Sequence, residues 1–229
     1  MQKDDLNAIL IITLHKKGHH MNQKNNDFTG VNQPKTRLGQ IKMNKLLEAA
    51  EELFTTKGFY QTSISDICKT AKTAVGTFYI YFDTKTDIYR YMMEGYEKEI
   101  KKRLAQAIRE CTTRYEKERE GIRCFIKYAV EKPNVYNIIW GSLSVSKELF
   151  ISYYESFAKS YTRALTKDCD ALSVPDTTTV AYMLMGISNF LGLRAMFEGM
   201  TDEDIDLLVD KTLMPALSDG IFSKKAISI

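Results

Sequence analysis

The chain of 229 residues has few of the residues that break helices and few of those that catalyse reactions. It contains four prolines and twelve glycines, so long helices are possible along most of its length. Its three histidines all fall within the first twenty residues. Histidine is the commonest general base and metal ligand, so their absence from the rest of the chain argues against a Ser-His or Cys-His enzyme. The sequence also lacks a phosphate-binding loop, and we expect neither an enzyme nor a bound cofactor.

Cysteine is also sparse, and its four positions include no Cys-x-x-Cys pair. They are Cys68, Cys111, Cys124 and Cys169. This spacing argues against a zinc site or a disulfide framework and indicates free thiols in a cytoplasmic protein. The apolar run at residues 8–15 is well below the roughly 18 residues that a membrane span needs. Two aspartates precede it, which is untypical of a secretory signal, so we expect a cytoplasmic protein outside the membrane.

The first 36 residues differ in composition from the rest. After the apolar run they are rich in Asn, Gln and Lys and lack periodicity, which predicts a disordered arm. Three candidate metal ligands lie there, namely His15, His19 and His20. A flexible end supplies no second shell to orient them, so we expect no metal site. An alternative is that translation begins at Met21 and residues 1–20 are not translated; purine-rich codons at 16–18, as in a ribosome-binding site, would support it.

The charge of the chain is only a mild indication of a partner. The formal net charge is +3, the pI is about 8.5, and the hydrophobic content of 44% is that of an ordinary globular protein. Residues 35–90 hold nine Lys or Arg and six Asp or Glu, an excess of three positive charges (9 − 6). A basic patch is compatible with these numbers, but any phosphate contacts must come from individually placed side chains.

The apolar pattern from residue 38 onward is helical throughout and predicts an all-α fold of about nine helices, without alternating strands. The first helix carries its apolar residues at i, i+3, i+4 and i+7 and ends near Gly58. Ser63 and Asp66 have the spacing of a capping box, which predicts the start of the second helix. Thr84 and Asp87 have the same spacing and predict the start of the fourth.

The stretch TAVGTFYIYF, residues 73–82, lies between these two starts and contains no charge. On a helical wheel, Phe78, Phe82 and Val75 point inward, Gly76, Thr77 and Ile80 point outward, and Tyr79 and Tyr81 lie on the flanks. Two short helices joined by a short turn are typical of a helix-turn-helix, whose second helix enters the DNA major groove. An aromatic-rich core helix is an equally good interpretation of the pattern alone.

Residues 46–89 resemble the DNA-binding domain of the tetracycline-repressor (TetR) family. The matching motifs are AA..LF...G in the first helix, TS...DI...A in the second, GTFY.YF in the third and TK.D at the start of the fourth. The resemblance implies three domains: an arm at 1–36, a helix-turn-helix domain at 37–88, and a ligand-binding and dimerisation domain at 89–229. It implies a ligand-responsive transcriptional regulator, most simply a repressor that an effector releases from a palindromic operator.

The resemblance also implies which residues contact double-stranded DNA. Thr77 would enter the groove, Tyr79 would bind a phosphate, and Ile80 would make apolar contact with a base. The full set of expected DNA-contact residues is Lys35, Arg37, Ser63, Ala74, Val75, Gly76, Thr77, Tyr79, Ile80, Tyr81 and Lys85. Three residues depart from the family pattern: Lys72 replaces a turn glycine, and Ala74 and Val75 replace polar residues. They keep an alternative open, a helical ligand-binding or interaction protein with weakened DNA recognition.

The remaining helices are expected to bind an effector and a second copy of the chain. The resemblance implies a homodimer through the last two helices, where Gly186 and Gly192 permit close helix approach and Pro215 should kink or end the final helix. Aromatic side chains in the middle helices predict a pocket for an apolar or aromatic small molecule, and no charged cluster there suggests a sugar phosphate or nucleotide. The expected ligand-binding residues are Phe125, Tyr128, Trp140, Tyr153, Phe157 and Phe190.

Overall fold

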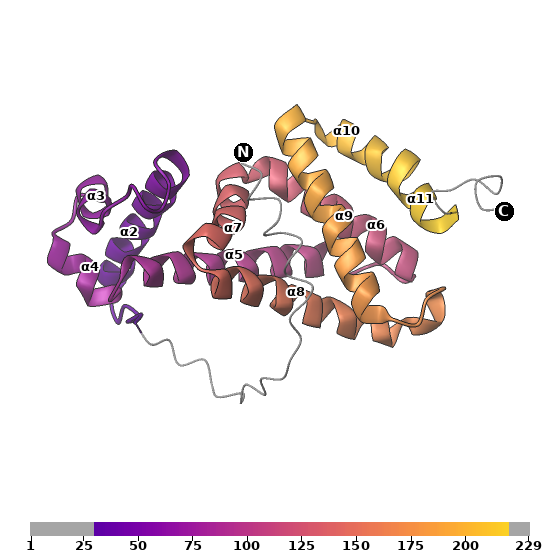
Figure 1. Cartoon of the computed structure of the whole chain (residues 1–229), viewed down its shortest axis with the longest axis horizontal. Helices are drawn as coiled ribbons and strands as arrows, with labels where there is room; N and C mark the ends of the chain where they lie inside the picture. Colours follow the sequence, from indigo (N-terminus) through magenta and orange to yellow (C-terminus); the bar gives the residue numbers. More distant parts are fainter. Residues whose placement is uncertain (1–29, 220–229) are drawn as a thin grey trace.

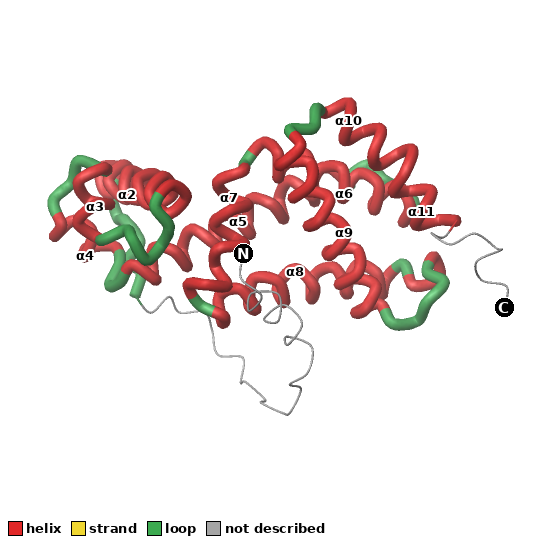
Figure 2. The backbone as a smooth tube through the Cα atoms, turned by 45° about the horizontal axis from the view of Figure 1, so that its top comes forward, coloured by secondary structure: helices red, strands yellow, loops and turns green. Residues whose placement is uncertain are grey.

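The computed structural model describes residues 30–219, which form helices and loops (Figure 2). Among these residues the sole β-type pairing is an isolated bridge between Val31 and Phe82. The helices are α2 (Arg37–Thr56), α3 (Ile64–Thr70), α4 (Val75–Tyr81), α5 (Lys85–Ala107), α6 (Arg114–Glu131), α7 (Pro133–Val145), α8 (Lys147–Lys167), α9 (Thr177–Glu198), α10 (Asp202–Leu207) and α11 (Met214–Asp219). If the continuous run from α10 to α11 is counted once, the described part has the nine helices expected from the sequence.

The starts and ends of the first helices follow the predicted local signals. Gly58 has a left-handed φ of 82° just after α2, which only glycine adopts at little cost. Ser63 and Thr84 each form the predicted capping box, with Asp66 and Asp87 respectively. Each box satisfies backbone N–H groups that the first turn of a helix leaves without partners. The chain direction at both helix starts is therefore determined by residues close in sequence.

The helices α2, α3 and α4 form one end of the molecule, and α5 runs from this end into the body (Figure 1). Phe78 and Phe82 are fully buried at this end, together with Leu46 and Ile67. The helix α5 is continuous through residue 88, where the sequence predicted a domain boundary. Both parts therefore share α5, and the boundary itself stays a prediction.

Residues 30–36, predicted to be disordered, are ordered in the structure. The Asn32 amide donates to the Tyr81 carbonyl at 2.8 Å, and the Asp83 amide donates to the Gly30 carbonyl at 3.1 Å. Val31 is buried in the same core as Phe78. Gly30 has a φ of 100°, and a Cβ there would lie 2.8 Å from Asp87 Cγ. The prediction was wrong for this segment because its partners are distant in sequence; His15, His19, His20 and Met21 lie outside the described residues.

The body is built around α9, which packs against α6 and α8. A Cβ on Gly192 would lie 3.2 Å from Ala129 Cβ, so the close approach expected at Gly192 occurs within the chain, against α6. Within residues 30–219, α9 is the one helix long and apolar enough to cross a membrane. The core helix of a water-soluble protein passes the same test, so this property is weak evidence for a span.

The last helix passes through Pro215 instead of ending there. Residues 208–213 form a π-helical turn between α10 and α11, and the Met214 amide donates to the Val209 carbonyl, five residues back. Proline cannot donate a helical hydrogen bond, and the wider turn just before it accommodates the missing donor. The prediction of a local disturbance is confirmed, but the helix continues to Asp219.

Candidate DNA-binding surface and ligand cavity

The turn between α3 and α4 holds Lys72 in the left-handed conformation that favours glycine. Its φ is 53°, and it is the one non-glycine residue of the described chain with a positive φ. The Thr73 amide donates to the Cys68 carbonyl at 2.9 Å and closes the end of α3. An L-residue in this conformation costs roughly 1–2 kcal/mol, because its Cβ approaches the following carbonyl. The fold therefore carries a strained lysine where the family pattern has glycine.

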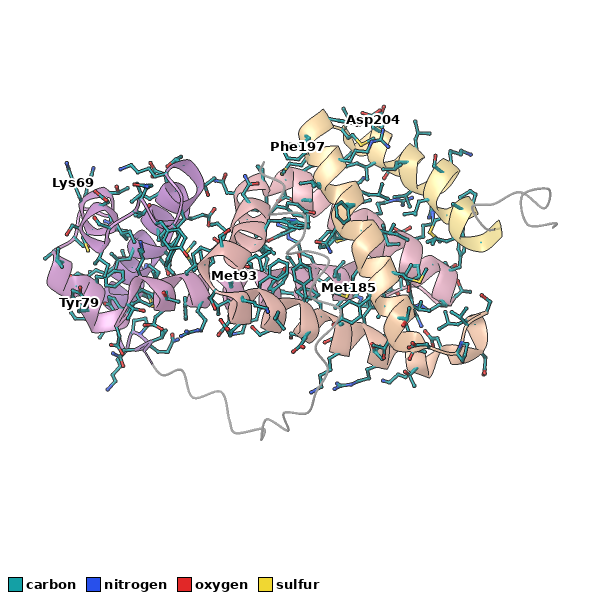
Figure 3. All side chains as sticks on the ribbon, in the orientation of Figure 1. Lys69, Tyr79, Met93, Met185, Phe197 and Asp204 are labelled. Carbon is teal, nitrogen blue, oxygen red and sulfur yellow. The ribbon has the colours of Figure 1, made fainter. Side chains whose placement is uncertain are left out.

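The helix α4 presents an exposed face between two buried anchors. Tyr79 and Ile80 are 52% and 59% exposed, and Figure 3 shows Tyr79 at the outer edge of this end of the molecule. A Cβ on Gly76 would meet nothing within 4 Å. Val75, predicted to point inward, is 43% exposed because it is the first residue of α4 and no neighbouring helix covers it. The exposed face is thus more apolar than expected.

Tyr81 differs from its predicted place on the flank of α4. It is only 5% exposed, and its hydroxyl lies 3.2 Å from the position that a Cβ on Gly39 would occupy. Its ring therefore packs the end of α4 against the start of α2. The helical wheel could not reveal this neighbour, and a direct DNA contact by Tyr81 is contradicted by its burial in this structure.

Two further side chains that were expected to contact DNA, Lys85 and Ser63, form hydrogen bonds within the protein. The Lys85 ammonium donates to the carbonyls of Phe59 and Thr62 at 2.6 and 2.7 Å and lies 4.3 Å from the Phe59 ring centroid. Burial lowers the pKa of Lys85. The Ser63 hydroxyl donates to Asp66 Oδ2 and accepts from the Asp66 amide. Both side chains help to hold the helix-turn-helix together in this structure, and their expected contacts with DNA stay predictions.

Exposed basic side chains lie just before and at the start of α2, following a segment that pairs with the end of α4. Lys35 and Arg37 are exposed, and the segment before them pairs with the end of α4 through Asn32. Lys69 of α3 is also exposed and lies at the outer edge in Figure 3. Lys69 was not among the residues that the sequence predicted to contact DNA.

The body contains a cavity of about 510 Å³ between α5, α6, α7, α8 and α9. Four of the six predicted ligand-binding residues line it, namely Phe125, Tyr128, Tyr153 and Phe157. Phe190 does not, because it lies on the outer side of α9 and is 59% exposed. Trp140 does not line the cavity either; its ring lies 6.0 Å from that of Phe190. These two predictions are wrong, since composition cannot tell which side of a helix faces the cavity.

Phenol hydroxyls provide most of the neutral polar groups of the cavity. The Tyr136 hydroxyl donates to the Asn189 carbonyl, and the Tyr154 hydroxyl contacts Asn189 Oδ1 at 3.3 Å. The Tyr128 hydroxyl is buried without a hydrogen-bond partner. Burial raises the pKa of Tyr128, Tyr136 and Tyr154, so all three are neutral donors near pH 7. The cavity can bind a mainly apolar molecule with a few hydrogen-bonding groups.

One end of the cavity is charged, contrary to the expectation from the sequence. Arg114 and Glu118 form an ion pair whose side chains are 9% and 10% exposed. The Tyr161 hydroxyl donates to Glu118, and the Lys117 ammonium lies 3.1 Å from Asp168 Oδ2. These residues were missed because a charged helix start such as TTRYEKERE has the composition of a solvated face. Among residues 30–219, no group of three or more His, Cys, Asp or Glu side chains could hold a metal ion.

The outer face of the last two helices is apolar. Phe197 is 76% exposed and lies at the end of α9 in Figure 3, and a Cβ on Gly186 would meet nothing within 4 Å. The exposed large apolar residues of α9, α10 and α11 are Tyr182, Met183, Phe190, Phe197, Leu207 and Leu217. Met183, Phe190 and Phe197 recur at intervals of seven residues and so share one side of α9, and an exposed apolar side of this kind is typical of an interaction site.

Sequence comparisons place the helix-turn-helix among known regulators. Residues 46–92 match the family model described as bacterial regulatory proteins, tetR family. The uncharacterized HTH-type transcriptional regulator YvdT of Bacillus subtilis is 52% identical over 54 residues, which cover 24% of this chain and 28% of YvdT. The fatty acid metabolism regulator protein of the same organism is 33% identical over 76 residues, which cover 33% of this chain and 39% of that protein. The chain thus matches well under half the length of these relatives.

Solved structures share the fold over most of the chain. A putative TetR-family transcriptional regulator from Syntrophomonas wolfei is 23% identical with a TM-score of 0.68, covering 81% of this chain and 98% of that one. FadR from Bacillus subtilis, solved in complex with stearoyl-CoA, is 21% identical with a TM-score of 0.67, covering 78% and 99%. Residues 46–92 thus match the tetR family model, and the chain as a whole shares its fold with these solved structures.

Proposed function

We propose that the protein is a homodimeric transcriptional repressor of the cytoplasm, which a small apolar effector releases from a palindromic operator. The observation that carries this proposal is the face of α4, which exposes Gly76, Tyr79 and Ile80 while Phe78 anchors it in the core. A short helix exposed in this way after a tight turn has the geometry that enters a major groove.

The composition of α4 determines how it would read DNA. Thr77 supplies a hydroxyl for a base edge or a phosphate, and Ile80 can contact a thymine methyl group. Gly76 allows close approach of the backbone to the duplex. Since α4 carries no charge, the phosphate contacts would come from Lys35, Arg37 and Lys69 around it.

The apolar outer face of α9 and α10 suits a second copy of the chain. A helix-turn-helix of this size reads one half-site, so an operator of two half-sites requires two-fold symmetry. Phe197 and Phe190 would supply apolar surface at the centre of the interface, and the open space at Gly186 would admit a partner helix. The dimer would then set the spacing of the two α4 helices.

The cavity supports an elongated apolar effector. The names of two similar proteins, a fatty acid metabolism regulator and a FadR bound to stearoyl-CoA, support an acyl chain as its body. A volume of about 510 Å³ lies within the range of roughly 300–1,000 Å³ usual for small-molecule sites. An effector would release the DNA only if it bound better to a dimer geometry that does not fit the operator.

The helix α7 connects the cavity to the DNA-binding end. Tyr136 and Ile139 of α7 line the cavity. On the other side, the Tyr60 hydroxyl donates to the Ser144 carbonyl at 2.5 Å, and the Tyr89 hydroxyl donates to the Ile138 carbonyl. An effector that displaces α7 would therefore also move the loop between α2 and α3.

The test is binding of the purified full chain to the DNA upstream of its own gene, measured at several salt concentrations. We expect a specific complex that Thr77→Ala together with Tyr79→Phe weakens by about tenfold or more, with the fold unchanged by circular dichroism. The matched control is Thr55→Ala together with Tyr115→Phe, two changes outside the proposed surface. If wild type shows no specific complex even at low salt, the proposal fails. The alternative, a ligand-binding protein with weakened DNA recognition through Lys72, Ala74 and Val75, would then be favoured.

A further inference from the structure

Much of the cavity lining comes from two antiparallel helices, each of which contributes a stripe of residues along one of its sides. On α6 the lining residues run from Arg114 to Tyr128, and on α8 they run from Tyr153 to Lys167. Each stripe repeats at intervals of three and four residues, so it stays on one side of its helix. At about 1.5 Å per residue, each stripe is roughly 21 Å long. The cavity is therefore elongated along the two helices.

The two ends of this cavity differ in chemistry. Arg114, at the start of α6, lies 3.5 Å from Asp168 at the end of α8, so the charged ends of the two stripes coincide. Tyr128 and Tyr153 belong to the opposite ends of the same stripes and share a hydrophobic core with the DNA-binding helices. A ligand with one polar and one apolar end therefore fits in one direction only.

The charged end carries more positive than negative charge. Arg114, Lys117 and Lys167 face Glu118 and Asp168, an excess of one positive charge (3 − 2). Lys101 also lines the cavity, but its ammonium is paired with Glu97 and bonded to Ser156. A neutral head group would gain little from this excess, and a cationic one would be repelled by it.

Arg114 also has unused hydrogen-bonding capacity. Its side chain is 9% exposed, and its Nε is buried without an acceptor. A guanidinium has five N–H donors in a planar fork, which matches the oxygens of a carboxylate or phosphate. Its nearest acceptors, Glu118 and Asp168, leave part of this fork free for an incoming oxygen.

We propose that Arg114, Lys117 and Lys167 bind the anionic head group of a single-chain amphiphile whose apolar chain extends toward the DNA-binding domain. The head is a carboxylate or a phosphate carried directly on the chain. The far end of the chain reaches Tyr128, Tyr153 and the α7 residue Ile139, so longer chains press more strongly on α7. This inference rests on the proposed function, because it assumes that the cavity holds the effector.

The test compares four twelve-carbon probes that differ in the head group: dodecanoate, dodecyl phosphate, dodecanol and dodecyltrimethylammonium. Binding to the full chain is measured by calorimetry below the micelle-forming concentration of each probe. We expect at least one of the two anions to bind about tenfold or more tightly than dodecanol, since hydrogen bonds to charged groups are the stronger ones. The tighter anion identifies the head group, and the cation should bind most weakly.

Variants test which side chains carry the preference. Removing Arg114 alone would leave Glu118 buried and unpaired, so the main variant is Arg114→Gln with Glu118→Gln, which keeps polar side chains of similar size. Lys117→Gln is a second variant at a more exposed position. The matched control is Arg109→Gln, whose side chain is 79% exposed and does not line the cavity. We expect the preference for anions to shrink in the double variant, which removes the guanidinium fork but keeps the excess of one positive charge. It should also shrink in Lys117→Gln and persist unchanged in the control.

Each contrary outcome has a definite meaning. Equal binding of dodecanol and the anions, or tighter binding of the cation, overturns the inference but leaves an apolar effector in place. An anion preference that is undiminished in both variants also overturns it, because the anion is then held elsewhere. If no probe binds while the protein still recognises its upstream DNA, both the inference and the proposed effector class fail, whereas the DNA-binding part of the proposed function stands.

Discussion

Lys72 has a backbone conformation that is unfavourable for a lysine. Its φ of 53° lies in the region that glycine adopts most easily, and a lysine there stores strain in the turn before α4. The turn keeps this strained conformation because the helices on both sides of it are fixed in the core, where Ile67 of α3 and Phe78 of α4 are fully buried.

We expect Lys72→Gly to raise the free energy of unfolding by up to about 1 kcal/mol, because relief of left-handed strain exceeds the entropy that glycine loses on folding. Lys72→Ala is the matched control, since it removes the same charge and keeps the Cβ. Urea denaturation of the three proteins measures the difference. A glycine variant less stable than the alanine variant would show that the turn is not strained.

Lys85 and Lys69 are both lysines of the DNA-binding end, but their surroundings predict opposite roles. Lys85→Met should destabilise the fold by about 1–3 kcal/mol, because the carbonyls of Phe59 and Thr62 lose a charged donor. Lys69→Gln should leave stability unchanged and reduce the slope of log affinity against log salt by about 1, the value for one phosphate contact. Urea denaturation and salt-dependent DNA binding separate the two effects. A lower salt slope in a folded Lys85→Met variant would restore Lys85 as a phosphate contact.

At the scale of elements, the helix α6 depends on the cap at its start. The Glu116 carboxylate accepts from the Thr112 and Thr113 amides at 2.9 and 3.0 Å, and Thr113 caps the helix in return. These hydrogen bonds lower the pKa of Glu116 to about 2 from its ordinary value of 4.5. A carboxyl with a lowered pKa stabilises the fold above its unfolded pKa and loses this contribution as the pH falls.

The stability difference between wild type and Glu116→Gln should therefore be constant above pH 4.5 and disappear as the pH approaches 2. Urea denaturation at a series of pH values measures it. Glu110→Gln is a suitable control, because that side chain is 84% exposed and forms its ion pair with the adjacent Arg109. A difference that stays constant down to pH 2 would mean that the charge of Glu116 does not support the cap.

The helix starts and ends that could be predicted from sequence are those that depend on residues close in sequence. The capping boxes at Ser63 and Thr84 and the left-handed Gly58 depend on residues within a few positions, and all three are confirmed. Tyr81 and Phe190 were misplaced because their exposure depends on helices far away in sequence. The charged end of the cavity was missed for the same reason. The sequence shows that Arg114 and Glu118 lie on the same side of a helix, but it does not show that this side faces a cavity. A helical pattern predicts which residues share a side, and only the fold decides what that side contacts.

At the scale of the whole molecule, two exposed apolar surfaces lie at different ends and are proposed to have different partners. One is the face of α4, and the other is the outer face of α9 and α10 (Figure 1). Ile80 on the first and Phe190 on the second are equally exposed, at 59% each. Replacing either with a charged residue removes a similar kind of surface without disturbing a packed core, so the two changes form a matched pair.

We expect Phe190→Glu to convert the proposed dimer to monomers, because two like charges would meet across its two-fold axis and two aromatic side chains would be lost from it. Its DNA affinity should fall as well, since a single half-site no longer has a partner. Ile80→Glu should remain dimeric and lose DNA binding through charge repulsion with phosphates. Sedimentation velocity and DNA binding on the same preparations distinguish the two variants. A Phe190→Glu protein that stays dimeric would place the interface elsewhere on the molecule, and a wild type that sediments as a monomer would exclude the dimer altogether.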